Sequence, residues 1–592
     1  MNWTRKNLRL WLESGWKLGL FASIVVVVVT SIPQLSLVIH QRDNWHGSYA
    51  IIDYDELSYS AYLNSLMHGR PRRNDPYTSD REKDAENLFS IQFLPPYVLA
   101  IIARASRVSA STVFILLMPL MAFLSSLAIF WFFYSVIGNA KAASVFMLIV
   151  LLCGGLVSQS GFKFGVAYSA FAFLRRYVPA VPFPLFFVFC LCSWRAFNLR
   201  FKRAKLWALF AGLVFSFLVF SYFYLWTAAA AWFFSLTMLW LIARPDERSH
   251  VFAVVAILLG ISVPALSLYF YLLSRRTQTT DIAQALTYTH APDLFRPIEI
   301  MGFLTLGWLI WGVLRRSINF RSPLAVLTAS FAIAPMVVFN QQIVTGITLQ
   351  PFHYEQFIIN HVVLVGLVLA YQMLGQHIKI RLFLWVVFAV GIGLATGLKE
   401  AHGNLSLNVR RDEAKPVFER LDSLVVHSDT DAIALFNNSL LAASAPTCSS
   451  VAQLWAPNLY TYSYTSRTEE IERLHLYLYY LGVDPLGLET DLRQNIQLQA
   501  AVFGLHRVNS LLSPQFTPIS DDEMHEAVAA YSAFIKGLSL EQVSRWPVSY
   551  VVMIDQEGYN LSNLDRWYFR DSGEVVGGCV LYRVRLKREA KG

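Results

Sequence analysis

Charged residues are scarce in this sequence. Only 15% of its 592 residues are charged, whereas 55% are hydrophobic and 15% are aromatic. The mean hydropathy is +0.43. A soluble protein of this size needs far more polar residues to cover its surface. The composition therefore excludes an ordinary soluble protein and predicts an integral membrane protein.

The usual signatures of metal, nucleotide and nucleic-acid binding are also missing. The five cysteines include no CxxC pair and have no set of histidines beside them, so the sequence does not predict a zinc-type site. The polar C-terminal third has no glycine-rich phosphate loop, and no segment repeats at a solenoid period. The net charge of +9 is modest and lies in short clusters between apolar runs, as membrane topology requires. It does not indicate a nucleic-acid partner.

The few cysteines divide into two groups. Cys153, Cys190 and Cys192 lie in apolar runs and are expected to pack as small apolar side chains. Cys448 and Cys579 lie in the polar C-terminal third, where a disulfide is open to them if that region is exported. A single pair has no spacing pattern that tests the idea.

Long apolar runs are what the sequence has in abundance. A membrane-spanning helix needs about 20 apolar residues. The first run is too long for a signal-peptide core and no small-residue cleavage site follows it, so we expect a retained anchor. We predict about eleven transmembrane helices, over residues 18–40, 111–136, 142–159, 181–199, 205–222, 224–243, 251–272, 298–314, 323–340, 357–375 and 382–398.

The charges between these runs predict the orientation of the chain. Arg5, Lys6, Arg9 and Lys17 flank the first run, which puts the N-terminus in the cytoplasm and residues 41–110 outside. Several later connections are short and basic, which suits the cytoplasm, although the outer set contains arginines too. An odd number of spans puts the C-terminus outside. We therefore expect a multi-pass protein of the plasma (inner) membrane with a periplasmic or extracellular C-terminal domain.

The composition changes at about residue 400. DAIALFNN, YVVMID and CVLYRVRL are typical of short strands, and RTEEIERLHLYLYYLG and DDEMHEAVAAYSAFIKG have helical periodicity. The predicted fold is thus a polytopic α-helical membrane protein with a C-terminal soluble α/β extracytoplasmic domain. We place the transmembrane domain at residues 1–398 and the α/β domain at residues 399–592.

An acidic segment follows the first apolar run. DYDELSYSAYLNSLMHGRPRRNDPY, residues 53–77, has three carboxylates within its first four residues. If a helix begins near Asp55, then Tyr59, Tyr62 and Leu66 share one stripe with it. This pattern predicts an amphipathic helix on the membrane surface, with Asp55 at its leading edge and facing inward.

Two of the three carboxylates have a structural explanation. Asp53 and Glu56 have the spacing of a capping box, with Asp53 as the N-cap and Glu56 reaching back. Asp55 has no such role, so it is the functional candidate. Asp53-Tyr54-Asp55 also matches the Asp-x-Asp pattern with which many soluble glycosyltransferases hold a metal and a nucleotide sugar. Nucleotide sugars are cytoplasmic, however, and this loop is predicted to be outside. A solvated acidic loop with no task remains the alternative.

The segment resembles the first outer loop of the GT-C superfamily, multispan glycosyltransferases that take sugars from polyprenyl-phosphate carriers. Members have an acidic pair, aromatics, a glycine and then Asn-Pro-Tyr or a variant. The corresponding residues here are Asp55-Glu56, Tyr59, Tyr62, Gly69 and Asp75-Pro76-Tyr77, with Asp75 in place of the usual Asn. A bacterial subgroup often met in polysaccharide gene clusters is similar over further stretches, so that the resemblance covers most of the chain: RRYVPAVPFP (175–184), YFYLWT (222–227), NQQIVTGITLQPFHYEQFI (340–358) and WAPNLYTYS (455–463).

The resemblance implies an inverting transfer of a sugar from a polyprenyl-phosphate carrier to an extracytoplasmic glycan, lipid or protein acceptor, at the surface of a lipid bilayer. Asp55 would be the general base that takes the proton of the acceptor hydroxyl. Glu56 or Asp53 would orient it or help to hold a divalent metal, Mg or Mn, and whether a metal is needed stays open.

Basic residues at the outer ends of the spans are candidates for binding the donor phosphate as it leaves. These are Arg175, Arg176, Arg275 and Arg276. Interfacial snorkelling and lipid-headgroup contact are the alternative for each of them. Residues expected to contact the acceptor or donor are Asp53, Tyr59, His353, Tyr354 and Glu355.

Three other functions stay open on the sequence. A lipid-linked sugar flippase or transporter would need ionisable residues near the middle of several spans, which are nearly free of charge here. A lipid-linked oligosaccharide ligase or polymerase shares the membrane setting and the donor chemistry. An inactive relative with an assembly role would not need the acidic pair Asp55-Glu56.

Overall fold

The computed structural model describes residues 15–78, 84–158, 171–199, 201–283, 286–374, 379–425, 432–462, 464–504, 507–508, 516–554 and 560–587. The chain forms two compact units, each assembled from three segments of the sequence. Unit 1 comprises Met1–Ser36, Ile115–Tyr271 and Tyr288–Leu405, and unit 2 comprises Leu37–Phe114, Leu272–Thr287 and Ser406–Gly592. The proposed boundary between residues 398 and 399 stays a prediction.

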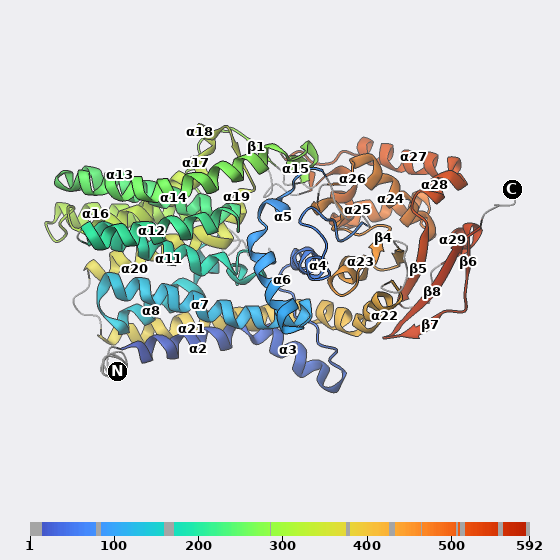
Figure 1. Cartoon of the computed structure of the whole chain (residues 1–592), viewed down its shortest axis with the longest axis horizontal. Coiled ribbons are helices and arrows are strands. Elements are labelled where there is room, and N and C mark those ends of the chain that lie inside the picture. The colour runs from blue at the N-terminus through green and yellow to red at the C-terminus, as the bar shows by residue number, and fades with distance from the viewer. Residues whose placement is uncertain are drawn as a thin grey trace. The chain divides into compact units, whose positions relative to one another are not determined.

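Unit 1 is built almost entirely from helices (Figure 1). Within it α11 packs along α12, and α13, α16, α17 and α20 pack against one another. The elements of this unit, some of which continue into unit 2, are α2 (Trp16–Thr30), α3 (Ile32–Gln41), α7 (Ala110–Ile137), α8 (Ala140–Leu152), α9 (Gly154–Val157), η2 (Ala172–Leu174), α11 (Pro182–Asn198), α12 (Phe201–Val219), α13 (Phe223–Ala243), η3 (Pro245–Glu247), α14 (Arg248–Ser274), α16 (Pro297–Leu314), α17 (Pro323–Asn340), α18 (Gln342–Thr345), β2 (Ile347–Thr348), α19 (Pro351–Tyr354), the π-helix η4 (Glu355–Ile359), α20 (Asn360–Leu374) and α21 (Lys379–Glu413).

Apolar helices make the chain a multi-pass membrane protein. Among the described residues, seven helices are long and apolar enough to span a membrane, or up to eight if the bent pair α2 and α3 is one span. Large apolar side chains cover their outer surfaces; of the most apolar stretch within Pro245–Ser274, only 22% is buried. Such a surface is stable in lipid and unstable in water. A helix lies at each predicted span, but α8 has only 13 residues, and the total of eleven stays a prediction.

The first span is broken where the sequence analysis predicts one continuous helix. The axes of the two parts differ by 48°, with α2 ending at Thr30 and α3 beginning at Ile32. Pro33 explains the break, because it has no N–H to donate to the carbonyl of Val29 and its ring crowds the preceding turn. The basic residues Arg5, Lys6 and Arg9, on which the predicted orientation rests, lie outside the described residues.

Unit 2 contains a mixed sheet and the helices around it. Its elements are η1 (Arg42–Asn44), α4 (Glu56–Met67), α5 (Leu88–Ile91), α6 (Leu94–Ser106), α15 (Gln278–Ala283), α22 (Lys415–Val425), β3 (Ile433–Phe436), α23 (Ser439–Ser444), η5 (Ala445–Thr447), β4 (Ala452–Gln453), η6 (Leu459–Tyr462), α24 (Arg467–Tyr480), α25 (Pro485–Gln494), α26 (Ile496–Phe503), α27 (Asp521–Gly537), α28 (Leu540–Ser544), β5 (Val548–Ile554), α29 (Ser562–Trp567), β6 (Tyr568–Arg570), β7 (Glu574–Val576) and β8 (Cys579–Leu586); β1 (Thr287–Tyr288) lies at the unit boundary.

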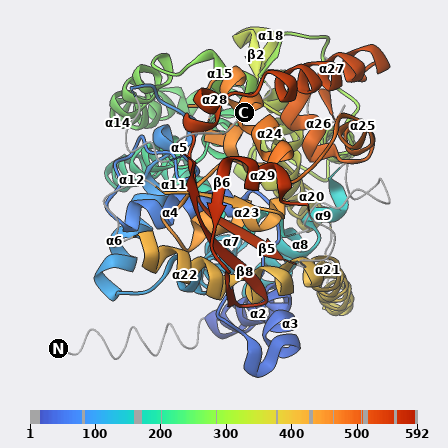
Figure 2. The ribbon, with the colours of Figure 1, turned by 90° about the vertical axis from the view of Figure 1, so that its right-hand side faces the viewer.

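The sheet has the strand order β4-β3-β5-β8-β6, and β7 also pairs with β8. β3 is parallel to β4 and β5, whereas β5 and β8 are antiparallel, with Val552 opposite Leu581. Figure 2 faces these strands, and β5 and β8 run side by side in it. The predicted strands within 431–438, 550–555 and 579–586 are confirmed as β3, β5 and β8, and the predicted helices as α24 and α27. Asp431 and Asp555, at the ends of two predicted strands, lie outside the described residues. No disulfide joins Cys448 and Cys579.

The helix that follows the acidic segment is a core helix of unit 2. α4 packs against α6, α23 and η5, and it is buried on nearly every side, including Leu57 and Leu63 on different faces. The prediction of an amphipathic surface helix is therefore wrong. Tyr62 and Leu66 of its stripe are buried, but so are Asn64 and Ser65 between them. The side chains of Asn64 and Ser65 hydrogen-bond within the unit, to the backbone oxygen of Pro446 and to Asn74.

Candidate functional site

The three carboxylates of the acidic segment lie at the beginning of α4, in an arrangement that differs from the predicted capping box. α4 begins at Glu56, and Asp55 occupies the N-cap position, so the assignment of Asp53 as the N-cap is wrong. Oδ1 of Asp53 accepts a hydrogen bond of 2.9 Å from the backbone N–H of Asp55. Glu56 does reach back, but its Oε2 accepts from the N–H of Ile52 at 3.1 Å. The chain thus makes an Asx-type turn before the helix, which delays the first helical residue.

The three carboxylates differ in their exposure. The side chain of Glu56 is fully buried and Asp53 is half-buried, whereas Asp55 is exposed. The hydroxyl of Tyr49 also donates to the backbone oxygen of Glu56 at 3.3 Å. A buried, hydrogen-bonded carboxylate fixes the backbone around it. The arrangement therefore places Asp55 at the exposed start of a core helix, beside a buried and hydrogen-bonded Glu56.

The same arrangement bears on a metal site. Among the described residues, no group of three or more His, Cys, Asp or Glu side chains converges in a way that would hold a metal ion. The oxygen of Glu56 that faces Ile52 is turned into the protein. Asp53, Asp55 and Glu56 as they stand do not fit a metal held by all three, so we derive no chemical step through a metal.

A mostly buried ion pair lies in the loop after α4, and it was not predicted from the sequence. Arg72 donates two hydrogen bonds of 2.6 Å to the two carboxylate oxygens of Glu86, and Ser90 donates a third at 2.6 Å. Burial by itself raises the pKa of the Glu86 carboxyl, but the hydrogen bonds from Arg72 and Ser90 outweigh it and hold that pKa below its usual range. The only signal in the sequence was that Arg72 belongs to the run RPRRNDPY between apolar stretches.

Residues from distant motifs contact α4 directly. Nδ2 of Asn458 donates to Oγ of Ser58 at 2.6 Å, and the hydroxyl of Tyr462 donates to the backbone oxygen of Ser58 at 2.6 Å. The ring of Tyr59 lies 5.6 Å from that of Phe89. The stretch WAPNLYTYS thus lies against the acidic segment, although almost 400 residues separate them; its Ser463 is outside the described residues.

Two of the predicted phosphate-binding arginines also belong to unit 2. The N–H of Glu86 donates to the backbone oxygen of Arg275 at 3.2 Å. Arg276 makes a two-contact ion pair with Asp281, at 2.6 and 3.2 Å. The side chain of Arg275 is exposed. The structure therefore brings both arginines to the loop after α4, but it engages the guanidinium of Arg276 in an ion pair.

Arg175 and Arg176 are buried in unit 1, with exposed fractions of 1% and 0%. Nη2 of Arg175 donates to the hydroxyl of Tyr222 at 2.8 Å, and its guanidinium carbon lies 4.3 Å from the ring centroid of Phe357. Nε donates to the backbone oxygen of Val178 at 3.1 Å. Interfacial snorkelling is excluded for a side chain buried in this way. The hydrogen bonds and the aromatic contact of Arg175 offset the cost of burying its guanidinium group.

The aromatic residues around Arg175 join three of the sequence motifs. The His353 ring lies 4.9 Å from that of Tyr224 and stacks on Phe357 at 5.0 Å. The hydroxyl of Tyr354 is 2.9 Å from that of Thr227. RRYVPAVPFP, YFYLWT and QPFHYEQFI therefore form one cluster in unit 1, which their separation in the sequence did not reveal.

Glu355 is engaged by an arginine that the sequence analysis overlooked. Arg296 forms ion pairs with both Glu355 and Asp293, and its guanidinium carbon lies 4.9 Å above the ring of Phe339. The Glu355 side chain is nearly fully buried. Arg296 thus neutralises the charge of Glu355, and a contact of Glu355 with the acceptor or donor stays a prediction. The signal was the pair Arg296-Pro297 just before an apolar run.

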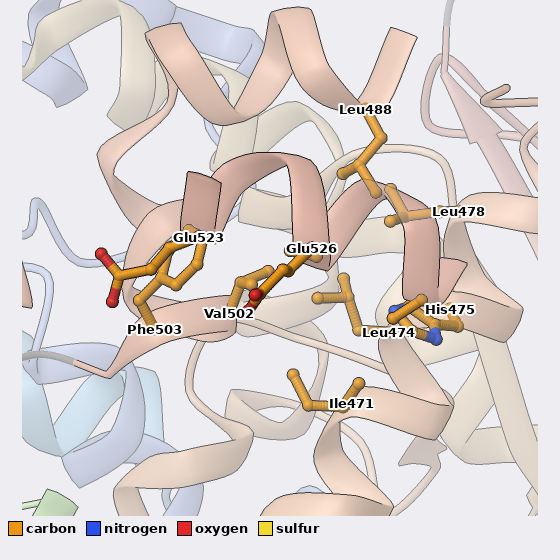
Figure 3. A pocket seen from close by; sticks show the side chains of 11 residues that line it. Ile471, Leu474, His475, Leu478, Leu488, Val502, Phe503, Glu523 and Glu526 are labelled. Carbon is orange, nitrogen blue, oxygen red and sulfur yellow. The ribbon is translucent and has the colours of Figure 1, made fainter. Parts of the chain in front are cut away.

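A cavity of about 330 Å³ lies in unit 2 between α24, α25, α26 and α27 (Figure 3). Its lining is mostly apolar, with Leu474 and Leu478 on one side and Val502 on the other. Burial lowers the pKa of His475 to about 4, so this ring is neutral at neutral pH. Glu523 at the rim is paired with Arg507, which holds the pKa of its carboxyl at about 2. None of the candidate site residues that were predicted from the sequence lines this cavity.

Comparison with known proteins relates the chain to three solved structures. No protein-family model matches it, and a comparison with curated proteins found no match. The apo structure of ArnT from Cupriavidus metallidurans is 11% identical, with a TM-score of 0.45 over 94% of this chain and 97% of ArnT. The Archaeoglobus fulgidus oligosaccharyltransferase tethered to an acceptor peptide is 13% identical, with a TM-score of 0.44 over 95% and 73% of the two chains. Arabinofuranosyltransferase AftD from Mycobacteria is 12% identical, with a TM-score of 0.47 over 95% of this chain and 41% of AftD. No residue role is carried over at these identities.

Proposed function

We propose that this protein is an inverting membrane glycosyltransferase that moves a sugar from a polyprenyl-phosphate carrier to an extracytoplasmic acceptor, with Asp55 as the general base. The observation that carries the proposal is the contrast among three neighbouring carboxylates. Glu56 is buried and hydrogen-bonded, Asp53 accepts from the turn, and Asp55 alone is exposed at the start of a core helix. A general base needs this combination of a fixed backbone and an accessible oxygen.

The proposed reaction is a single displacement at the anomeric carbon of the donor sugar. The acceptor hydroxyl oxygen forms the new bond to that carbon on the face opposite the phosphate, while the bond from the carbon to the phosphate oxygen breaks. The electron pair of the broken bond leaves with the polyprenyl phosphate, and the hydroxyl proton goes to the carboxylate of Asp55. The configuration at the anomeric carbon is therefore inverted.

Cationic and hydrogen-bonding groups would stabilise the negative charge of the leaving phosphate. In unit 1 we assign this role to Arg175 and the adjacent Arg176, with His353 and Tyr354 as contact candidates. Arg175 and His353 both contact Phe357, and His353 and Tyr354 both pack against Tyr224. In unit 2 the exposed Arg275 is a better candidate than Arg276, whose guanidinium is paired with Asp281. The acidic segment faces the periplasm or cell exterior in this proposal, where lipid-linked donors remain available.

The test follows the label of radiolabelled polyprenyl-phosphate sugars as it leaves the lipid fraction, in membranes matched for protein amount. Wild type is compared with Asp55→Asn and Glu56→Gln, and Asp43→Asn serves as a control because Asp43 is an exposed acid that precedes the same helix. We expect turnover of one donor by wild type and the control, and a loss of at least about 100-fold in Asp55→Asn. A parallel arm with a chelator tests the need for a divalent metal.

The outcomes separate the proposal from its alternatives. Equal turnover by wild type, Asp55→Asn and Glu56→Gln would show that neither carboxylate is the base. If wild type consumes no monosaccharide donor but transfers label from a lipid-linked oligosaccharide, the protein is a ligase or polymerase. If label crosses the bilayer without leaving its carrier, the protein is a flippase.

A further inference from the structure

The backbone that leads into α4 is held by side chains from the junction of α21 and α22, more than 350 residues away in the sequence. Asn408, Arg411, Asp412 and Lys415 are spaced at i, i+3, i+4 and i+7, so their side chains share a face at the end of α21 and the start of α22. We call these four side chains the clamp, and residues 46–52 the lead-in segment. All of them belong to unit 2.

Asp412 and Lys415 hold the first part of the lead-in segment. Oδ2 of Asp412 accepts from the N–H of His46 at 2.9 Å, and Oδ1 accepts from the N–H of Ser48 at 2.9 Å. Nζ of Lys415 donates to the backbone oxygen of His46 at 2.7 Å. Gly47, between His46 and Ser48, has a φ of 84°, a left-handed conformation that favours glycine.

Arg411 and Asn408 hold the second part. Nη1 of Arg411 donates to the backbone oxygen of Tyr49 at 3.0 Å, and its guanidinium carbon lies 4.6 Å above the Tyr49 ring. Asn408 makes two bonds to one residue: its Oδ1 accepts from the N–H of Ile51 at 2.8 Å, and its Nδ2 donates to the oxygen of Ile51 at 3.3 Å. All of the hydrogen bonds from the clamp go to backbone groups of the lead-in segment. They therefore fix the path of its backbone.

The far end of the lead-in segment is tied to the acidic pair. The N–H of Ile52 donates to Glu56, the residue next to Asp55, and the hydroxyl of Tyr49 donates to the Glu56 oxygen. The backbone from His46 to Glu56 is thus fixed at both ends. Asp412 is fully buried. A buried charged group often contributes less stability than an apolar side chain of similar volume would. The directional bonds of Asp412, by contrast, give one conformation to a loop that apolar contacts would leave less defined.

We propose that Asp412 and Asn408 are positioning residues for Asp55, holding the lead-in segment so that the carboxylate of Asp55 is presented at the first turn of α4. This inference rests on the proposed function of Asp55. The inference implies that catalysis also depends on residues outside the first loop. The hydrogen bonds from the end of α21 to residues 46–51 must stay in place.

The test combines kinetics with hydrogen exchange on the full-length protein in detergent. Asp412→Asn keeps the shape of the side chain but turns an N–H donor towards a backbone N–H. Glu413→Gln is the matched control, because Glu413 is the next residue and is exposed. We expect kcat to fall by about 10- to 100-fold in Asp412→Asn with the donor KM within about threefold of wild type. Amide exchange in residues 46–52 should become faster, and Glu413→Gln should change neither quantity.

A double variant separates positioning from general destabilisation. In the Asp55→Asn background, Asp412→Asn should lower the residual rate by no more than about twofold, because the group that it positions is already gone. An equal fall in both backgrounds would overturn the inference, as would faster exchange with an unchanged kcat. If Asp412→Asn does not fold, Lys415→Met, which removes one bond to His46, is measured in the same way, and it is expected to lower kcat and speed exchange to a smaller extent.

Failure of this inference is distinguishable from failure of the proposed function. One outcome is that wild type turns over no donor while amide exchange in residues 46–52 becomes faster in Asp412→Asn. The proposed function and the positioning role then both fail, but the clamp still holds the lead-in segment. If exchange does not rise, the clamp does not hold the segment, whatever the activity.

Discussion

Arg72 and Glu86 are joined by two parallel hydrogen bonds of 2.6 Å, with the Glu86 side chain 1% exposed and the Arg72 side chain 25% exposed. The guanidinium also donates to the backbone oxygen of Ser90. The pair therefore ties residue 72, just after α4, to the start of α5. Two-point ion pairs of this kind restrict orientation as well as distance, so the pair stabilises the loop on the far side of the acidic helix.

The first prediction concerns this pair. Glu86→Gln leaves the Arg72 guanidinium without its counter-charge in a mostly buried position, which costs about 3–5 kcal/mol in fully buried cases. Because Arg72 is partly exposed, solvent reduces this, and we expect about 1–3 kcal/mol less free energy of unfolding. Denaturant unfolding of the purified protein measures it. Glu574→Gln, which breaks an exposed pair with Arg420, should cost under about 1 kcal/mol; equal losses in the two variants would contradict the prediction.

The second prediction concerns Arg175. Arg175→Lys keeps the positive charge but loses the fork that reaches Tyr222 and the planar contact with Phe357. If Arg175 helps to bind the donor phosphate, the donor KM should rise by about tenfold, which corresponds to about 1.4 kcal/mol. Steady-state kinetics measure this, and Arg195→Lys, at a half-buried arginine of unit 1 that bonds Ser135, is the control. An unchanged donor KM in Arg175→Lys would show that Arg175 does not bind the donor phosphate and has a structural role instead.

The third prediction concerns Gly154 in unit 1. A Cβ at this position would lie 2.4 Å from Cε1 of His361, whose ring is held edge-on by Phe173 and Phe183 and whose Nδ1 is 2.8 Å from the backbone oxygen of Val150. Gly154→Ala should therefore displace the imidazole and destabilise the protein by about 1–3 kcal/mol. Thermal unfolding in detergent tests this. Gly260→Ala, where a Cβ meets no atom within 4 Å, should be neutral or slightly stabilising, and a similar loss there would point to a general effect of the substitution.

The fourth prediction is a pH dependence at Glu470 in α24. Burial raises the pKa of its carboxyl to about 7, although Arg467 opposes this. Since the folded pKa is above that of the unfolded chain, the folded state binds the extra proton. The stability contribution is therefore complete below about pH 4.5 and is lost as the pH rises through about 7. Glu470→Gln removes this loss.

The measurement is the midpoint of thermal unfolding of wild type and Glu470→Gln at pH 5 and pH 8. The variant should be the more stable protein at pH 8, by up to about 3 kcal/mol, and should have no advantage at pH 5. Glu541→Gln, at an exposed residue of α28, serves as the control. An advantage of the same size at both pH values would mean that the proton on Glu470 is not its cause.

Local patterns predicted much of the architecture. The strands β3, β5 and β8 and the helices α24 and α27 were recognised from alternation or helical periodicity over fewer than 20 residues, which is information that the segment itself contains. The break between α2 and α3 was overlooked although Pro33 was visible, because one proline in a long apolar run does not reveal whether the helix bends or ends. The capping box failed for a similar reason: Asp53 and Glu56 have the right spacing, but the Asx-type turn between Asp53 and Asp55 shifts the start of α4.

The sequence by itself determined that this is a multi-pass membrane protein with an α/β region and an acidic pair after its first apolar run, since composition and short-range periodicity are sufficient for those conclusions. Only the tertiary structure decided that Glu56 is buried while Asp55 is exposed. The same is true of the contacts of Arg175 with Tyr222 and Phe357. It is also true of the hydrogen bond between Asp412 and the N–H of Ser48. Each of these depends on contacts between residues that are far apart in the chain. A single sequence does not contain the pairing of such residues, because burial and hydrogen bonding are properties of the packed chain and not of the residue type.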